Sequence, residues 1–399
     1  MDARECAYQV LCKVMIDQGY ASLFMRSFLK DLCESDKKMV SEIVYGTLRN
    51  HRLVRYQWES YPSKKCDKRL AIVLDMAAYQ YYFMEKPAYA VLNEMVSLVK
   101  KPERGFINAI LRKMVEEPLR IPDNLGIRYS QPDWLVNMWK AHYGEETCEK
   151  MLVALNELPI TFGRLNTLKV NKDELQGVTF LDDIGFIYEG NLVNTEWFKE
   201  GKVAIQDYSS QQVVKHLGVK PWLRVLDCCS APGTKATQMA IQMKNQGEII
   251  CIELHEARKQ LIEQAAQKYG IDIIKAYQGD ATQLETMKLG LFDRILVDAP
   301  CSGLGVLQRK PDIRLKVTPE SIDEIVDLQK KILESAAKCL KVNGWMVYST
   351  CTLNKKENER QVKRFLDNHT NFELVEERSI FPYEYHSDGF YYAKIRRIA

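Results

Sequence analysis

The stretch Arg224-Val-Leu-Asp-Cys-Cys-Ser-Ala-Pro-Gly-Thr-Lys235 decides the fold of this chain. Residues 224–228 predict a short buried strand, and the small residues after them predict a tight turn into a helix. Ala231 and Gly233 would let the backbone approach a ligand, and the amino terminus of the following helix favours a carboxylate. Because the Gly-x-Gly-x-x-Gly pattern of dinucleotide enzymes is missing here, the stretch weighs against NAD.

Apolar runs alternate with helical patterns from residue 222 onward, as expected when helices cover both faces of a parallel sheet. The sequence predicts strands at 224–228, 248–252, 273–277, 294–297 and 345–348, and helices notably at 256–269 and 321–340. Residues 390–395 predict one more strand, running antiparallel to the others. Residues 216–399 are therefore predicted to form a Rossmann-like α/β domain.

Acidic residues follow the second and third predicted strands. Glu253 could accept hydrogen bonds from both ribose hydroxyls of an adenosyl cofactor, and Asp280 could accept one from the adenine amino group. A single acid after a strand is more often a helix cap. Acids at successive strand ends, however, favour a cofactor site at this edge of the sheet.

Two cysteines stand at the ends of the fourth and fifth predicted strands, in Asp298-Ala-Pro-Cys-Ser-Gly303 and Ser349-Thr-Cys-Thr352. A lone cysteine is more often a small buried apolar residue than a nucleophile. Two cysteines that face the same crevice favour a catalytic role over a structural one. Cytosine C5 attacks a methylsulfonium only after a thiolate has added to C6, and a base must then remove the C5 proton so that the thiolate can leave.

The first 115 or so residues predict consecutive amphipathic helices, because apolar residues recur at the spacing of one helical face. The apolar stripes lie within 7–15, 40–48, 70–81, 91–99 and 106–114. Residues 1–120 are therefore predicted to form an all-helical domain. Prolines at 118, 122 and 132 predict a linker, followed by a small α+β domain over 130–215.

The amino-terminal part carries an excess of positive charge. Residues 1–120 hold 20 Lys and Arg against 15 Asp and Glu, whereas the rest of the chain holds 36 against 38. A basic cluster interleaves the cations Arg49, Arg52, Arg55, Lys64, Lys65, Lys68 and Arg69 with His51, Tyr56, Trp58 and Tyr61. This mixture suits phosphate neutralisation and base stacking. The alternative is a solvated helical surface whose aromatic residues belong to the core.

In their order and spacing, Asp-Cys-Cys-Ser-Ala-Pro-Gly-Thr-Lys, Asp-Ala-Pro-Cys-Ser-Gly-Leu-Gly and Ser-Thr-Cys-Thr resemble the RNA cytosine-C5 methyltransferase superfamily, the NOL1/NOP2/Sun family. The helical first domain resembles a NusB-like RNA-binding module. Over nearly the whole chain, the combination resembles the bacterial 16S ribosomal RNA methyltransferases of that superfamily. The resemblance implies a class I methyltransferase domain, S-adenosyl-L-methionine as cofactor and ribosomal RNA as substrate.

The resemblance also implies roles for particular residues. Cys351 would be the nucleophile, Cys301 would be needed for product release, and Asp298 would contact both cofactor and cytosine. The implied cofactor contacts are Cys229, Ser230, Ala231, Pro232, Gly233, Thr234, Lys235, Glu253, Asp280 and Asp298. Arg164, Arg309, Lys310 and Arg314 match family segments and are expected, with Arg49, Arg52 and Arg55, to bind RNA. The family usually has glycine where Thr234 stands and aspartate where Glu253 stands, and neither change removes a required functional group.

The composition also bears on metal binding, on membrane insertion and on the alternative functions. Eleven cysteines without any Cys-x-x-Cys, and six scattered histidines, argue for reduced thiols and against a metal site. Because no apolar run approaches the roughly 18 residues of a membrane span, we expect a cytoplasmic protein. Two alternatives stay open. One is a related cytosine-C5 methyltransferase acting on transfer RNA or 23S ribosomal RNA, and the other is an RNA-binding protein with a degenerate methyltransferase half. The helical first domain favours 16S RNA over transfer RNA.

Overall fold

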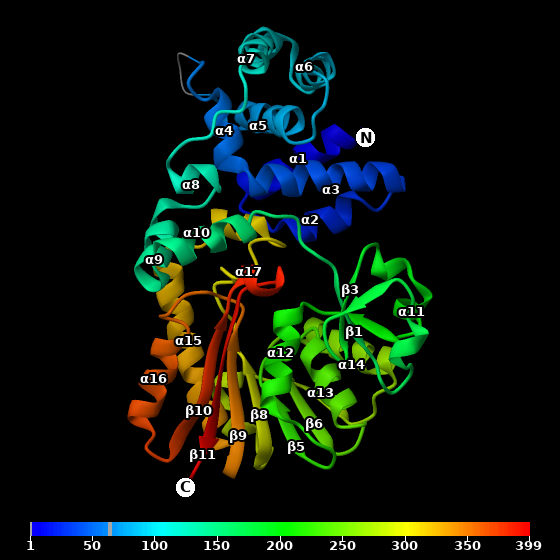
Figure 1. Ribbon diagram of the computed structural model, residues 1–399, viewed down its shortest axis with the longest axis vertical. Helices are drawn as coiled ribbons and strands as arrows, with labels where there is room; N and C mark the ends of the chain where they lie inside the picture. Colours follow the sequence, from blue (N-terminus) through cyan, green and yellow to red (C-terminus); the bar gives the residue numbers. More distant parts are fainter. Residues whose placement is uncertain (1, 63–65) are drawn as a thin grey trace. The chain divides into compact units, whose positions relative to one another are not determined.

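A computed structural model describes residues 2–62 and 66–399 of the chain. They form two compact units, coloured along the sequence in Figure 1. The first comprises the residues up to Glu157 together with Leu307–Lys316, and the second comprises Leu158–Val306 together with Val317–Ala399. The helices between residues 125 and 154 belong to the first unit, and the small sheet after them belongs to the second.

The first unit is helical, as predicted. Its described elements are α1 (Ala3–Met15), α2 (Ala21–Phe28), α3 (Glu34–Arg49), α4 (His51–Trp58), α5 (Lys68–Tyr82), α6 (Ala88–Ser97), η1 (Lys101–Glu103), α7 (Arg104–Glu116), α8 (Leu125–Arg128), α9 (Asp133–Tyr143), α10 (Glu145–Ala154) and the distant turn η5 (Pro311–Leu315). Ala7, Val10, Leu11 and Val14 show why α1 forms, since they lie one helical turn apart and are fully buried. The other predicted stripes also contribute to this core, although Phe106 is exposed.

A small antiparallel sheet opens the second unit. Its strands are β1 (Phe162–Leu165), β2 (Val178–Phe180), β3 (Gly185–Tyr188) and β4 (Val203–Ile205), in the spatial order β2-β3-β1-β4. The short elements η2 (Lys172–Glu174), η3 (Leu192–Asn194) and α11 (Glu196–Lys199) connect them, and α12 (Tyr208–Leu217) follows.

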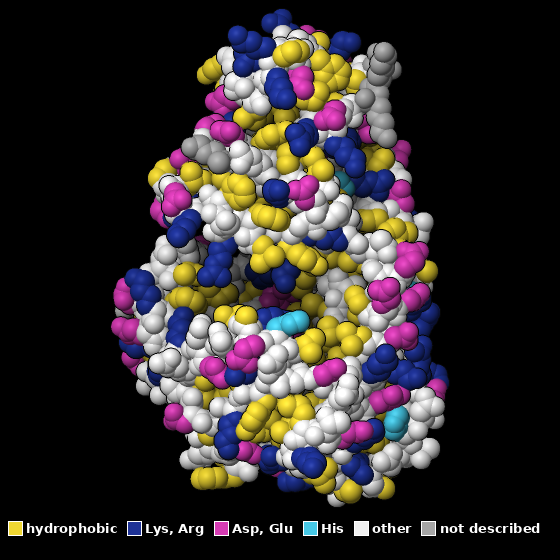
Figure 2. Space-filling model, turned by 180° about the vertical axis from the view of Figure 1, so that it is seen from behind, with side chains coloured by type: hydrophobic (Ala, Val, Ile, Leu, Met, Phe, Trp, Pro, Cys, Tyr) yellow, Lys and Arg dark blue, Asp and Glu magenta, His cyan; other side chains and the backbone are white. Residues whose placement is uncertain are grey.

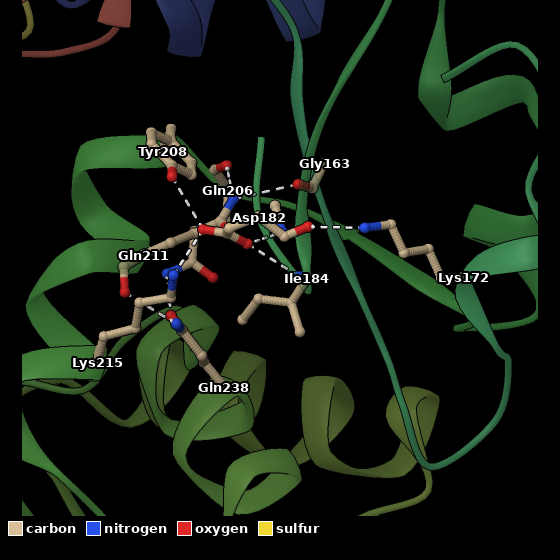
Figure 3. Close-up of polar contacts among 10 residues, drawn as sticks. Gly163, Lys172, Asp182, Ile184, Gln206, Tyr208, Gln211, Lys215 and Gln238 are labelled. Atoms are coloured by element: carbon tan, nitrogen blue, oxygen red, sulfur yellow. Dashed lines mark hydrogen bonds and ion pairs between the residues drawn. The ribbon is translucent and has the colours of Figure 1, made fainter. Parts of the chain in front are cut away.

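Asp182 ties the turn between β2 and β3 to helix α12. Its carboxylate accepts hydrogen bonds from the backbone N–H groups of Ile184 and Gly185, from the Tyr208 hydroxyl at 2.9 Å and from Lys215 Nζ at 2.6 Å (Figure 3). Burial raises the pKa of Asp182, but these donors outweigh it and lower the pKa to about 2. The small sheet is therefore held to α12 by a charged cluster.

A mixed seven-stranded sheet forms the centre of the second unit. Its strands are β5 (Arg224–Asp227), β6 (Glu248–Glu253), β7 (Ile274–Gln278), β8 (Phe292–Asp298), β9 (Leu340–Thr350), β10 (Phe372–Ile380) and β11 (Phe390–Arg397), in the order β10-β11-β9-β8-β5-β6-β7. The five predicted parallel strands are all present, and β11 runs antiparallel to β9 as predicted. Strand β10 was not predicted.

Helices cover both faces of this sheet (Figure 1). Helices α15 (Pro319–Lys338) and α16 (Glu359–Asn368) pack on the face that receives Leu226, and α12, α13 (Thr234–Gln242) and α14 (Glu256–Tyr269) pack on the face that receives Val225. Neighbouring residues thus enter opposite cores, as strand geometry requires. The remaining elements are η4 (Ala281–Met287) and α17 (Pro382–Tyr385). The Rossmann-like fold is confirmed.

Candidate active site

The loop 229–235 joins β5 to α13 at the carboxyl end of the parallel sheet. Gly233 has a φ of 95°, and a Cβ there would lie 3.1 Å from the Cα of Ile262 on α14. Glycine is required at this position because an L side chain rarely adopts that φ. Thr234, which replaces the family's usual glycine, is the first residue of α13. Since Thr234 lies in ordinary helix, the loop conformation accommodates the departure.

Two predicted cofactor residues follow β6 and β7. Glu253 is 5% exposed, accepts a hydrogen bond from the backbone N–H of His255 and lies 3.5 Å from Arg258 Nη1. Asp280 is exposed, and its Oδ1 accepts hydrogen bonds at 2.8 Å from the backbone N–H and hydroxyl of Thr282. Asp280 therefore caps η4 through Oδ1, as the sequence analysis gave for the alternative to a cofactor contact.

The two predicted catalytic cysteines lie side by side. Cys301 Sγ and Cys351 Sγ are 3.2 Å apart, and both side chains are partly exposed. The neighbouring Cys351 thiol and burial together raise the pKa of Cys301 well above its ordinary value. Gly305 N–H donates to the Cys351 carbonyl oxygen at 3.0 Å, and a Cβ on Gly305 would meet the Gly389 carbonyl. Two loops from adjacent strands thus bring both thiols to one place.

Asp298, at the end of β8, lies among polar groups. Its Oδ2 accepts a hydrogen bond from Lys235 Nζ at 2.7 Å, and its Oδ1 accepts one from Ser349 Oγ at 2.8 Å. Lys235 Nζ also lies 5.3 Å from the centre of the Phe390 ring. The arrangement links the cofactor loop, Asp298 and the end of β9.

Asp227 is a residue that sequence reasoning quoted in its motif but did not select. It is 1% exposed and lies near the Ser230 side chain and the Cys229 backbone, which lower its pKa, but its oxygens make no hydrogen bond of ordinary geometry among the described residues. Burial raises its pKa to about 7, with a smaller contribution from the charge of Asp298. The available signal was its position, because an acid that ends a buried strand and precedes a turn is costly unless something neutralises it.

Arg164 is not placed to contact RNA. It is 1% exposed, and its guanidinium donates to Gln206 Oε1 at 2.6 Å, to the Thr234 carbonyl at 2.8 Å and to Thr237 Oγ1 at 3.1 Å. Gln206 in turn donates to Gln238 on α13, and Gln238 donates to the Gln211 carbonyl (Figure 3). The expectation of an RNA contact is corrected, because this guanidinium fixes the start of α13 to β1.

Arg49 and Arg314 are buried within the first unit. Arg314 is 3% exposed and donates to the carbonyl oxygens of Arg49 and Ser130 at 2.6 and 3.2 Å. Arg49 Nη2 donates to the carbonyl of Gln308 at 3.1 Å. Burial lowers the pKa of Arg314 to about 9. These two expected RNA contacts are also corrected, since both guanidinium groups instead hold the segment Leu307–Lys316 in the helical unit.

Arg52 and Arg55 are engaged in ion pairs inside the same unit. Arg52 makes a two-pronged pair with Asp133 at 2.9 and 3.1 Å, and Arg55 pairs with the fully buried Asp75. Their availability to phosphate is therefore reduced. Lys64 and Lys65 of the predicted cluster lie outside the described residues.

Arg309 and Lys310 remain as candidate RNA contacts. Arg309 is partly exposed and Lys310 is exposed, in the segment Leu307–Lys316. Figure 2 shows Lys and Arg side chains interspersed with acidic and apolar ones on one face of the molecule.

Neither a membrane-spanning helix nor a metal cluster is found in residues 2–62 and 66–399. No helix in that part is long and apolar enough to cross a bilayer. The same residues contain no group of three or more His, Cys, Asp or Glu side chains that could hold a metal ion.

Comparisons with known proteins cover the whole chain. The family model described as 16S rRNA methyltransferase RsmB/F matches residues 215–396, the NusB family matches 1–116, and an RsmF/B-like ferredoxin-like domain matches 131–178. A probable ribosomal RNA small subunit methyltransferase B from Bacillus subtilis (strain 168) is 32% identical over 442 aligned positions, which cover 99% of this chain and 98% of that protein.

Two further comparisons agree with these matches. The corresponding probable methyltransferase B of Synechocystis sp. (strain ATCC 27184 / PCC 6803 / Kazusa) is 31% identical, with full coverage of both chains. The crystal structure of the protein PH0851 superposes with a TM-score of 0.82 at 23% identity, and covers 100% of this chain and 99% of that one. The similarity to PH0851 shows a shared fold.

The Rossmann-like sheet, the glycine-bearing loop after β5 and the acids at successive strand ends fit the methyltransferase domain that the family model identifies. With relatives above 30% identity along its full length, the chain belongs to the ribosomal RNA small subunit methyltransferase B family. It is an S-adenosylmethionine-dependent ribosomal RNA methyltransferase. The resemblance seen in the sequence is confirmed.

The residues present fit this cofactor. S-adenosylmethionine carries a positive sulfonium and a positive ammonium group, and Asp227 presents a buried carboxyl whose oxygens make no hydrogen bond of ordinary geometry among the described residues. Glu253 supplies a second buried acid at the neighbouring strand end. An acidic pocket suits a cationic ligand.

Proposed function

We propose that the chain transfers a methyl group to C5 of a specific cytosine in 16S ribosomal RNA, through a covalent bond between Cys351 Sγ and C6 of the base. The observation that carries the proposal is the 3.2 Å separation of the two thiols at the ends of β8 and β9. The 16S substrate is supported by the description of the matching family model and by the small-subunit names of the relatives. We place the reaction in the cytoplasm, with ribosomal RNA as the macromolecular partner.

Loop 229–235, Glu253, Asp280 and Asp298 would hold the cofactor, which supplies an electrophilic methyl group. Asp227 would place a buried carboxyl beneath that loop, where it could favour the positive charge of the cofactor. Arg164 positions the end of the loop through its hydrogen bond to the Thr234 carbonyl. These contacts would hold the cofactor at the edge of the sheet where the thiols lie.

Cys351 would add as a thiolate to C6, which makes C5 nucleophilic enough to take the methyl group that the cofactor supplies, with S-adenosylhomocysteine as the leaving group. Asp298 would accept a hydrogen bond from the cytosine amino group, and Lys235 Nζ, 2.7 Å from Asp298 Oδ2, would keep this carboxylate ionised. The C5 proton then passes to a base, the C5–C6 double bond re-forms and Cys351 leaves as a thiolate. One proton is released to solvent per turnover.

The cysteine pair gives these steps an order. While Cys351 is free, its thiol is the main reason that the pKa of Cys301 is raised, so Cys301 keeps its proton. Bond formation would convert Cys351 into a neutral thioether and remove this cause, whereas burial and the charge of Glu357 would still raise the pKa of Cys301. Cys301 can then lose its proton to solvent and accept the C5 proton, which permits elimination.

The test is position-resolved detection of 5-methylcytosine. Purified chain and S-adenosylmethionine are incubated separately with 16S RNA, 23S RNA and transfer RNA, and each RNA is sequenced after bisulfite treatment. We expect one protected cytosine in 16S RNA. Protection only in transfer RNA or 23S RNA would favour a related substrate, binding without methyl transfer would favour a non-catalytic protein, and methylation at an atom other than C5 would overturn the proposal.

A further inference from the structure

A buried polar cluster lies directly behind the cysteine pair and has no part in the steps above. Its members are Gln329 on α15, Asn354, Glu357 and Asn358 on the segment between β9 and α16, and Ser302 and Thr352, each of which follows one of the cysteines. All of these side chains are buried. Burial of so many polar groups is costly unless their geometry is used.

Glu357 holds both sides of Cys301. Its Oε2 accepts hydrogen bonds from the backbone N–H of Ser302 at 2.9 Å and from Gln329 Nε2 at 3.1 Å, and its Oε1 accepts one from the Ser302 hydroxyl. Gln329 Nε2 also donates to the carbonyl of Pro300 at 3.0 Å. The residues before and after Cys301 are therefore fixed to one carboxylate, directly or through Gln329.

Asn358 does the same for Cys351. Its Nδ2 donates to the Thr352 carbonyl at 2.9 Å, and its Oδ1 accepts a hydrogen bond from Thr350 Oγ1 at 2.6 Å. The residues before and after Cys351 are thus fixed to one amide. A 2.8 Å contact between the Ser302 and Thr352 hydroxyls joins the two loops.

We propose that Glu357 and Asn358 are positioning residues for the cysteine pair, Glu357 for the release step through Cys301 and Asn358 for the attack step through Cys351. The inference rests on the proposed function, since it divides the two residues by the step that each cysteine performs. Consecutive residues on one segment set the separation of the two thiols.

Charge supports the role of Glu357. Burial raises the pKa of Glu357, and the donors around it offset this rise only in part. Four donors face its two oxygens, counting Asn354 Nδ2 at 3.1 Å, and a set without any acceptor suits the ionised carboxylate. After the Cys351 thiol and burial, the negative charge of Glu357 is a further cause that raises the pKa of Cys301. Glu357 therefore also helps to keep Cys301 protonated until it is needed.

The first experiment measures thiol reactivity without RNA. Iodoacetamide alkylation of Cys301 and Cys351 is followed by mass spectrometry in wild type, Glu357→Gln, Asn358→Ala and the control Glu359→Gln, whose carboxylate contacts Ser379. We expect Glu357→Gln to speed alkylation of Cys301 relative to Cys351 at least threefold, and Asn358→Ala to leave the Cys301 rate unchanged. The inference would be overturned if the ratio of the Cys301 to the Cys351 alkylation rate were that of wild type in both variants while S-adenosylmethionine affinity was intact.

The second experiment assigns the steps with labelled 16S RNA on a denaturing gel. Glu357→Gln should lower turnover at least tenfold and accumulate a covalent protein–RNA band, because release fails. Asn358→Ala should lower turnover without such a band, because attack fails. Should Glu357→Gln not fold, Ser302→Ala removes one donor to Glu357 and should give the same band. A band from Asn358→Ala but not from Glu357→Gln would contradict the assignment of the two steps. Shifted thiol reactivity without a covalent band in any variant would instead contradict the covalent mechanism of the proposed function and leave the positioning role intact.

Discussion

Lys235 Nζ and Asp298 Oδ2 are 2.7 Å apart, and this ion pair joins the start of α13 to the end of β8. Burial lowers the pKa of Lys235, but the charge of Asp298 outweighs it and the pKa is raised. Lys235 belongs to the proposed cofactor loop, and Asp298 is the proposed cytosine contact. The ion pair therefore links the two binding functions of the site.

Lys235→Met should lower the free energy of unfolding by about 2 kcal/mol at pH 7, less than the roughly 3–5 kcal/mol for a fully buried pair because Asp298 is partly exposed. A raised folded pKa means that the contribution is fully present below the unfolded pKa of about 10.4, and is lost as pH rises through the folded value. Urea unfolding at pH 7, 9 and 11 measures this. Lys259→Met, in a surface pair with Glu256, is the control. A difference that persisted unchanged at pH 11 would contradict the account.

Glu253→Ala should weaken S-adenosylmethionine binding by about 1.5–3 kcal/mol, the usual cost of losing a charge-assisted hydrogen bond. Glu256→Ala, three residues along on the exposed start of α14, should bind normally. Calorimetric titration compares the two. Equal affinity for wild type and a folded Glu253→Ala variant would remove this residue from the cofactor site.

Asp227→Asn should make the cofactor-free protein more stable than wild type above pH 7, by about 2–4 kcal/mol. The folded pKa of Asp227, about 7, exceeds the ordinary value near 3.9, so only the folded state binds this proton between those pH values. Wild-type stability therefore falls as pH rises from 4 to 7, and the advantage of the variant should grow across that window. Chemical unfolding at pH 5 and pH 8 tests the prediction, which fails if the two proteins differ equally at both.

Lys310→Glu should weaken RNA binding and reduce its salt dependence while leaving stability unchanged, because this side chain is exposed. Arg55→Ala should instead lower the free energy of unfolding by about 2–3 kcal/mol, since it leaves the buried Asp75 without its cation. Filter binding at several salt concentrations, together with urea unfolding, separates the two effects. Wild-type RNA affinity for Lys310→Glu would exclude this lysine from the interface.

The sequence predicted the parallel core of the fold well. Helix α14 was expected at 256–269 and spans Glu256–Tyr269, because a glycine with positive φ ends it at Gly270. Strand β10 was missed, since Glu373, Glu376 and Glu377 give this edge strand a polar appearance. Helix α16 was missed for the same reason, because few of its residues are apolar.

The residues of the site were predicted unequally. Strand order brings the ends of β8 and β9 together, so the cysteine pair could be expected from two short motifs. The roles of Arg164 and Arg314 could not, because an arginine that donates to distant carbonyl groups looks the same in a sequence as one that faces phosphate. Asp75 offered a partial signal, since an acid inside an apolar helical stripe requires an internal partner such as Arg55.

The most direct test of the covalent mechanism compares Cys351→Ala and Cys301→Ala with labelled 16S RNA and S-adenosylmethionine on a denaturing gel. Cys351→Ala removes the nucleophile and should give neither methylation nor a slow band. Cys301→Ala should still attack and transfer the methyl group, and should accumulate a protein–RNA band that resists heat and detergent. A band from Cys351→Ala but not from Cys301→Ala would reverse the assignment, and full turnover by both variants would contradict the covalent mechanism.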